Sequence, residues 1–155
     1  MPERKYAKYI ITTPKTPRPE YLKKKEDQRK SGSYTETTRL FSLDDTVAKG
    51  AFYTDCVWIW SKKGPEGVKT EIAHSHDFDE VLGFIGTVRS DPYDLGGEIE
   101  FWLDDEQYIF NKTCLIFVPK GLKHLPLIFR RVDSPIFFFT EGNGTAYTRS
   151  TGKEY

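Results

Sequence analysis

The 155-residue sequence has few cysteines, no long apolar run and no apolar N-terminal segment, and each of these absences excludes a class of protein. Two cysteines are too few for the disulfide framework of a small secreted domain. No stretch approaches the roughly 18 consecutive apolar residues of a transmembrane helix, and the first ten residues, MPERKYAKYI, lack the apolar core of a signal peptide. We therefore expect a cytoplasmic protein in which Cys56 and Cys114 are buried reduced thiols, with a single disulfide as the alternative.

Net charge is also absent, but the charges are unevenly distributed. Residues 1–40 carry 11 basic and 5 acidic residues (+6), whereas residues 41–155 carry 12 basic and 18 acidic residues (−6). Prolines at positions 14, 17 and 19 favour extended structure, followed by one short helix over 20–30. We interpret residues 1–40 as a basic arm on an acidic surface of a partner subunit, which predicts a homodimer. Nucleic-acid binding is the less favoured alternative, and we expect no membrane association.

Helical periodicity is missing after about residue 38, where β-branched and aromatic segments alternate with turn signals. A chain of this length supports one domain with a buried core. The sequence predicts an all-β antiparallel sandwich or small barrel over residues 41–155. The expected strands are 39–45, 51–60, 68–76, 80–88, 97–103, 107–110, 113–119, 125–132 and 135–142.

Histidine is scarce, yet all three histidines fall in two short segments. IAHSHDFDEVLGF, residues 72–84, holds His74 and His76, whose side chains share one face of an extended strand. A tight turn at DFD is expected to fold the chain back, so that Glu80 faces the same space. The third histidine, His124, ends the segment PKGLKH. A polar turn would account for the first segment alone, but not for both segments.

These segments resemble the two sequence motifs of the cupin family. His-x-His-x(3,4)-Glu matches residues 74–80, and Pro-x-Gly-x-x-His matches residues 119–124. The resemblance covers about residues 50–142 and implies a double-stranded β-helix, or jelly-roll barrel, with one metal bound by three histidines and a glutamate. The implied ligands are His74, His76, Glu80 and His124. Several turn residues depart from the family pattern, and Ile128 stands where an asparagine is common, which separates this chain from the best-known branches.

Three imidazoles and one carboxylate suit a divalent first-row transition metal, namely Fe, Mn, Ni, Cu or Zn, rather than calcium or magnesium. Four protein ligands leave one or two coordination positions for substrate or water. Asp77 and Asp79 are expected to be exposed and not to bind the metal.

The strand at residues 51–60 has two faces, and either Phe52, Thr54, Cys56, Trp58 and Trp60 or Tyr53, Asp55, Val57 and Ile59 line the barrel. With either face, we expect an apolar and aromatic cavity for a small, largely apolar or aromatic substrate with one chelating oxygen group. Tyr53, Asp55 and Arg130 are candidates for proton transfer beside Glu80. The insertion at 86–97, with Tyr93, is expected to form a lip over the mouth.

Two classes of function fit these expectations. The favoured one is a metal-dependent enzyme: a dioxygenase, a lyase or decarboxylase, an isomerase or a hydrolase. The alternative is a non-catalytic ligand-binding cupin with a structural metal. Fold alone does not decide between them, because function resides in the site.

Overall fold

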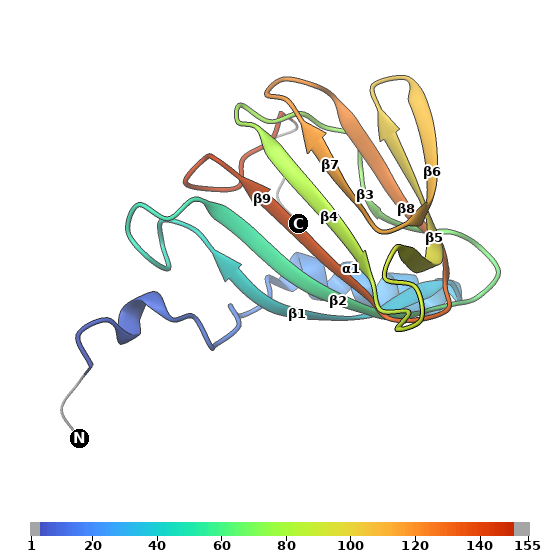
Figure 1. The fold of residues 1–155 in the computed structure, drawn as a ribbon, viewed down its shortest axis with the longest axis horizontal. Coiled ribbons are helices and arrows are strands. Elements are labelled where there is room, and N and C mark those ends of the chain that lie inside the picture. Colours follow the sequence, from blue (N-terminus) through green and yellow to red (C-terminus); the bar gives the residue numbers. More distant parts are fainter. Residues whose placement is uncertain (1–3, 151–155) are drawn as a thin grey trace.

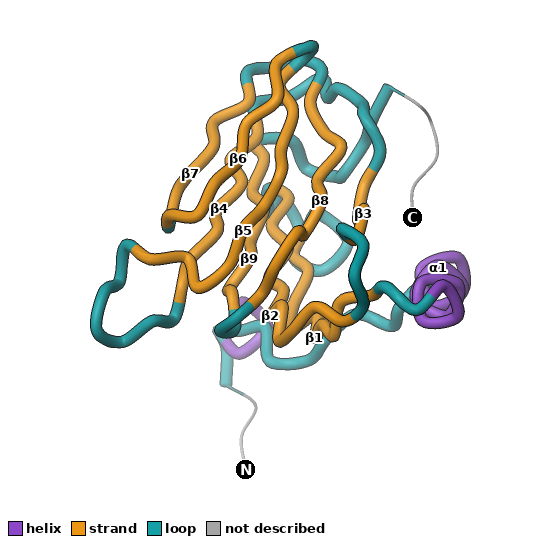
Figure 2. Tube along the Cα trace, turned by 90° about the vertical axis from the view of Figure 1, so that its right-hand side faces the viewer, coloured by secondary structure: helices purple, strands orange, loops and turns teal. Residues whose placement is uncertain are grey.

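The computed structural model describes residues 4–150 and consists mainly of two antiparallel β-sheets that face each other (Figures 1 and 2). The five-stranded sheet has the order β1 (Tyr34–Leu43), β2 (Tyr53–Lys63), β9 (Ile136–Gly142), β4 (Glu80–Gly86), β7 (Cys114–Val118). The four-stranded sheet has the order β3 (Val68–Glu71), β8 (His124–Val132), β5 (Asp94–Leu103), β6 (Glu106–Lys112). Strands distant in sequence are neighbours in both sheets, and the predicted all-β jelly-roll architecture is confirmed.

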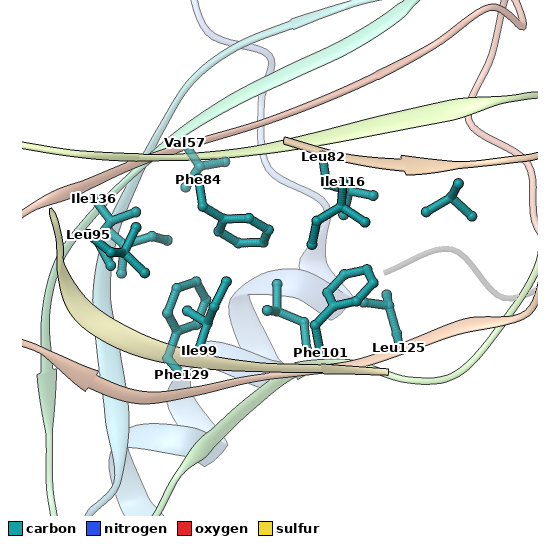
Figure 3. Packing of buried hydrophobic residues seen from close by; sticks show 13 residues of the cluster. Val57, Leu82, Phe84, Leu95, Ile99, Phe101, Ile116, Leu125, Phe129 and Ile136 are labelled. Atoms are coloured by element: carbon teal, nitrogen blue, oxygen red, sulfur yellow. The ribbon is translucent and has the colours of Figure 1, made fainter. Parts of the chain in front are cut away.

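The core lies between the two sheets and is built by alternate residues of the strands. Phe84 on β4 faces Phe101 on β5 and Phe129 on β8 across the layer, and all three are almost completely buried (Figure 3). Each such side chain contributes about 1.5–3 kcal/mol relative to exposure. The period-2 alternation therefore holds the sheets together, while residues at their edges remain available for a site.

The connection from β3 to β4 differs from the expected hairpin. β3 ends at Glu71, before the histidines, and pairs with β8, whereas β4 begins at Glu80 and pairs with β7 and β9. The DFD segment thus carries the chain from one sheet to the other instead of joining two neighbouring strands. Glu80 still begins the next strand, as the sequence predicts.

The basic segment contains the predicted helix, α1 (Pro19–Ser31), after a short 3-10 turn, η1 (Ala7–Tyr9). Pro19 begins α1, where its missing N–H costs nothing, and Gly32 ends it in the left-handed conformation with φ of 84°. β1 then starts at Tyr34 and pairs with β2, so residue 40, the expected end of the arm, lies within β1.

α1 lies beside the outer edges of both sheets (Figure 2). Gln28 donates to the carbonyl of Lys69 and Lys24 donates to that of Thr70, both on β3. On the other side, Arg29 forms an ion pair with Glu36 on β1. The helix therefore covers the unpaired edge of β3, which would otherwise expose backbone hydrogen-bonding groups.

Neither helix in the described part of the chain is long and apolar enough to cross a membrane. Cys56 and Cys114 are both free thiols, as predicted, and each is partly buried.

Candidate metal centre

The two histidine segments are joined through their backbones. The N–H of His74 donates to the carbonyl of His124 at 3.1 Å, and the N–H of His124 donates back at 2.9 Å. Gly121, whose φ of 83° gives the left-handed turn before His124, donates its N–H to the carbonyl of His76. Residues that exchange both hydrogen bonds in an antiparallel pair project side chains to the same face. This pairing brings the histidines together from segments about fifty residues apart.

All three imidazoles are buried and anchored in the same way. Each Nδ1 lies within hydrogen-bonding distance of a backbone carbonyl: that of Ile72 for His74 (2.7 Å), Thr148 for His76 (2.5 Å) and Leu122 for His124 (3.1 Å). Since a carbonyl only accepts, each Nδ1 must donate, so Nε2 carries the lone pair whenever the ring is neutral. The ligand atoms of the three histidines lie within 4.8 Å of one another.

This arrangement fits a bound cation. The Nε2 atoms of His74 and His76 are 3.1 Å apart, and when both rings are neutral and protonated at Nδ1 neither Nε2 can donate to the other. A metal ion at the centre of the cluster would convert this repulsion between lone pairs into coordination. Anchoring of the distal ring nitrogen by a carbonyl is the usual support for a metal-bound imidazole.

Glu80 adds a carboxylate to the same space. Its Oε2 lies 3.1 Å from Nε2 of His124 and 3.3 Å from Nε2 of His76. Among the buried side chains of residues 4–150, Glu80 Oε2 and His124 Nε2 are two of the few atoms without a hydrogen-bond partner. Burying such atoms is costly unless a donor or cation compensates. The three nitrogens and one oxygen together suit a first-row transition ion.

The surroundings of the proposed ligands shift their pKa values in different directions. Burial, with the neighbouring His124 and His76, lowers the pKa of His74 to about 4. Burial acts in the same direction on His76, but Glu80 outweighs it and raises the pKa of His76 above its usual value. Burial opposes ionisation of Glu80, yet His124 and His76 hold its pKa below the usual range. Near neutral pH His74 is therefore uncharged and Glu80 is a carboxylate.

The sequence did not point to Tyr147, which the structure places at the centre. Its hydroxyl lies 3.1 Å from Nε2 of His74, and its ring packs against those of His76 and Tyr53. Burial raises the pKa of Tyr147, so its phenol remains protonated. The segment after β9 has neither strand alternation nor a recognisable motif. The position of this segment directly after the last strand was the one feature of the sequence that could have indicated that Tyr147 lies near the histidines.

The same segment closes the site on the side of β3. Ser75 and Ser150 exchange hydrogen bonds at 2.9 and 3.1 Å, which fixes the carbonyl of Thr148 beside His76. The buried Arg149 forms a 2.6 Å ion pair with Glu71 at the end of β3. Residues beyond the two motifs therefore set the orientation of His76.

The structure resolves which face of β2 is turned inward. Tyr53, Asp55, Val57 and Ile59 line a cavity of about 260 Å³ that also includes His74, Glu80 and Tyr147. Part of its wall is apolar, with Leu82, Leu125, Leu127, Phe129 and Phe138 from the other strands. Charged side chains line the rest, so the expectation of a cavity with few polar groups was wrong.

Tyr53 and Asp55 both line the cavity from β2. Tyr53 packs against Tyr147 beside the histidines, whereas Asp55 is held by residues of β1. The hydroxyl of Tyr53 is 2.5 Å from that of Thr140, and burial, with the charge of Asp55, raises the pKa of Tyr53 well above its usual value. Asp55 forms an ion pair with Arg39 at 3.0 Å and accepts a hydrogen bond from Ser42. Burial raises the pKa of Asp55 in spite of both partners.

Two expected features lie elsewhere. Arg130 is exposed on β8 and pairs with Glu98, so it does not face the cavity. The insertion with Tyr93 follows Gly86, at the end of β4 remote from Glu80, and Tyr93 is 72% exposed. The expectation of a lip over the metal centre was wrong, because the connection leaves the opposite end of the sandwich. Asp77 is exposed, whereas Asp79 accepts a hydrogen bond from the backbone of Lys120.

The two facing sheets and the buried histidine cluster define a jelly-roll protein with a candidate metal centre. The sequence matches no family model, and no curated protein is significantly similar to it. Solved structures with a similar fold, all cupins, include an oxalate oxidase in complex with glycolate (12% identity, TM-score 0.49). Others are KdgF from Halomonas sp. (15%, 0.40) and the DMSP lyase DddQ from Ruegeria pomeroyi DSS-3 (18%, 0.41).

The aligned regions cover 74%, 69% and 78% of this chain, and 53%, 77% and 54% of the respective structures. The chain thus spans about half the length of the oxalate oxidase chain.

Proposed function

We propose that the chain is a metal-dependent cupin enzyme that acts on a small, largely apolar or aromatic oxygenated substrate. The proposed ligands are His74, His76, Glu80 and His124, the residues that the two motifs indicated. The observation that supports the proposal is the set of three carbonyl-anchored imidazoles around a buried carboxylate oxygen, which lies 3.1 Å and 3.3 Å from two of their Nε2 atoms. A non-catalytic cupin with a structural metal remains the competing function.

A divalent transition ion at this centre would supply a Lewis acid with open positions for a substrate oxygen. Tyr147, uncharged and 3.1 Å from Nε2 of His74, is placed to donate a hydrogen bond to an oxygen held there. Glu80 is the carboxylate closest to the imidazoles and can accept a proton from the substrate. The apolar part of the wall, with Leu82, Leu125 and Leu127, can contact an apolar portion of the substrate.

The roles proposed for Tyr53 and Asp55 are less direct. Tyr53 packs against Tyr147, with ring centroids 5.0 Å apart, and keeps its proton, so we propose that it orients Tyr147. Asp55 is farther along β2 and is held by Arg39, so we propose that it interacts with substrate and takes no part in metal binding.

The metal ligands are tested by measuring metal content of protein purified without added metal. His76→Ala and His124→Ala should each lose most of the bound metal, because an incomplete shell remains. Asp105→Asn, which alters an exposed carboxylate in the turn between β5 and β6, is the control and should retain it. Full occupancy in the His74→Ala/His76→Ala double variant would contradict the assignment.

The metal identity then selects among the reactions. Iron or copper with oxygen uptake on substrate addition would indicate a dioxygenase, whereas zinc would favour hydrolysis or isomerisation. Assays of the metal-loaded protein should use aromatic enols, keto acids and lactones, with and without oxygen. Tight binding of one compound without turnover of any would instead establish the ligand-binding alternative.

A further inference from the structure

The outer part of the cavity is lined by five basic side chains, which we call the basic wall. They come from the segment before α1, from α1 itself and from β1: Lys15, Arg18, Lys24, Lys25 and Arg39. The other part of the same cavity contains His74, Glu80 and Tyr147. The basic residues near the N-terminus therefore face, within the same subunit, the space that leads to the candidate metal centre.

Packing of α1 does not account for this placement. No residue of α1 is buried, and Leu22 remains 55% exposed, so the helix presents no apolar face to the barrel. Lys24 and Gln28 attach it to β3 through backbone carbonyls. Lys25 contributes little to this attachment, since its ammonium contacts the hydroxyl of Thr35 on β1, at 3.3 Å, and the ring of Tyr21 on α1, and neither residue belongs to β3.

The carboxylates of the cavity are already engaged. Asp44 pairs with Lys15 at 2.6 Å, and Asp55 pairs with Arg39 at 3.0 Å. Glu71 pairs with Arg149, and Glu80 lies among the histidines. Within residues 4–150, no carboxylate lies within 4 Å of the Lys25 ammonium.

Lys25 is consequently a partly desolvated cation among like charges. Burial, followed by the charges of Lys24, Arg29 and Arg39, lowers its pKa to about 8. Glu36 acts in the opposite direction, but Arg29 already pairs with it. An anionic group in the cavity would remove this imbalance, because Coulomb attraction is strong where water is partly excluded.

We infer that the substrate carries a second oxyanion group, remote from its metal-binding oxygen, and that Lys25 binds this group with Lys24 and Arg39 beside it. The substrate class is a small acid with an apolar middle and an oxyanion, carboxylate or phosphate, at each end. The inference rests on the proposed function for the metal-binding end. From the sequence we expected a substrate with one chelating oxygen group on an otherwise apolar molecule. The inferred substrate instead has two polar ends.

The test compares monoacids and diacids of equal chain length as unreactive probes. Binding of hexanoate and hexanedioate, then octanoate and octanedioate, is measured by calorimetry on the zinc-loaded full chain at low ionic strength. At one length or more the diacid should bind about tenfold more tightly than the monoacid. A carboxyalkyl phosphate of the same length distinguishes phosphate from carboxylate at the outer end.

Two variants of α1 locate the effect. Lys25→Gln should reduce the ratio of diacid to monoacid affinity to about one while leaving monoacid binding nearly unchanged. Lys23→Gln removes an exposed lysine of the same helix that does not line the cavity, and it should leave the ratio unaltered. Equal affinities of diacid and monoacid at every length, or an unchanged ratio in Lys25→Gln, would overturn the inference.

A second readout separates this inference from the proposed function. In the lysine NMR spectrum, the pKa of Lys25 should rise on saturation with the diacid and not with the monoacid. Wild-type protein that binds no metal would refute the proposed function. Metal-loaded protein that binds monoacid and diacid alike, with no change at Lys25, would refute only the second oxyanion site.

Discussion

At the residue scale, the centre depends on hydrogen bonds that fix the ring tautomers before any metal binds. The carbonyls of Ile72, Thr148 and Leu122 hold the Nδ1 protons, so the three Nε2 atoms are presented together. Such preorganisation is typical of metal sites. The motif spacing indicated the four side chains, but not the carbonyl of Thr148 or the hydroxyl of Tyr147, because nothing in the sequence relates residues 147–148 to the histidines.

Glu80→Gln tests the carboxylate. The amide keeps the size and one oxygen donor but removes the negative charge and the capacity to accept a proton. We expect the variant to retain measurable metal and to lose turnover by about 10²-fold or more. Metal analysis and kinetics on the same preparation give both quantities, with Asp105→Asn, an exposed carboxylate, as control. Undiminished turnover would exclude Glu80 from the chemistry.

Metal affinity should depend on pH through His76. Its pKa is raised, so below that pKa a metal ion must displace a proton from its ring, whereas His74, with a pKa of about 4, is already deprotonated. Affinity should therefore fall by about tenfold per pH unit below the pKa of His76 and level off above it. Competition with a chromogenic chelator from pH 5 to 9 measures this profile. A flat profile would show that His76 is not protonated in the metal-free protein.

At the element scale, the strands could be predicted because alternation records which face of each is buried, as in the β2 face formed by Tyr53, Asp55, Val57 and Ile59. The pairing partners of the strands could not be predicted in the same way, because β3 and β4 are neighbours in sequence and yet lie in different sheets. The helix was predicted from the segment EYLKKKEDQRK, residues 20–30, which follows the prolines and is closed by SGS. Its position against β1 and β3 depends on long-range polar contacts that leave no periodic pattern.

Lys25→Gln on α1 should stabilise the ligand-free protein. The pKa of Lys25 falls from 10.5 in the unfolded chain to about 8 in the fold, so the folded state disfavours its charge. This penalty is fully present below pH 8 and disappears as pH rises toward 10.5. We expect a gain of about 1 kcal/mol, or roughly 3 °C in Tm, at pH 7, shrinking above pH 8. Calorimetric scans at pH 7 and at a pH above 8, with Lys23→Gln as control, measure the change in stability. A loss of stability in Lys25→Gln at pH 7 would contradict the prediction.

At the scale of the whole molecule, α1 covers the side of the sandwich between the edges of β1 and β3. The chain before α1 is largely exposed and extends away from the sheets (Figure 1). Its exposed apolar residues are Tyr6, Tyr9 and Ile10. We propose that this part of the basic arm, rather than α1, contacts the partner subunit of a homodimer.

Deletion of residues 1–13 tests that proposal. It removes the exposed apolar residues and part of the positive charge but leaves Lys15, α1 and the whole sandwich intact. The dissociation constant of the dimer should rise by about tenfold, and added salt should weaken the intact dimer in part. Analytical ultracentrifugation gives both values. A monomeric full-length chain, or equal dimerisation of the truncated one, would refute the proposal.

The backbone pairing of His74 with His124, together with the contact of His76 with Thr148, has a consequence for the lifetime of the protein in a cell. These contacts join the segment between β3 and β4, the start of β8 and the segment after β9, so the ligand cluster exists only while both sheets are assembled. A metal that binds this cluster binds the native chain alone, and at 1,000 times its dissociation constant it adds about 4 kcal/mol to the free energy of unfolding. Proteases that cleave the transiently open chain should therefore degrade the metal-free protein much faster, and the abundance of the protein should follow the supply of its metal.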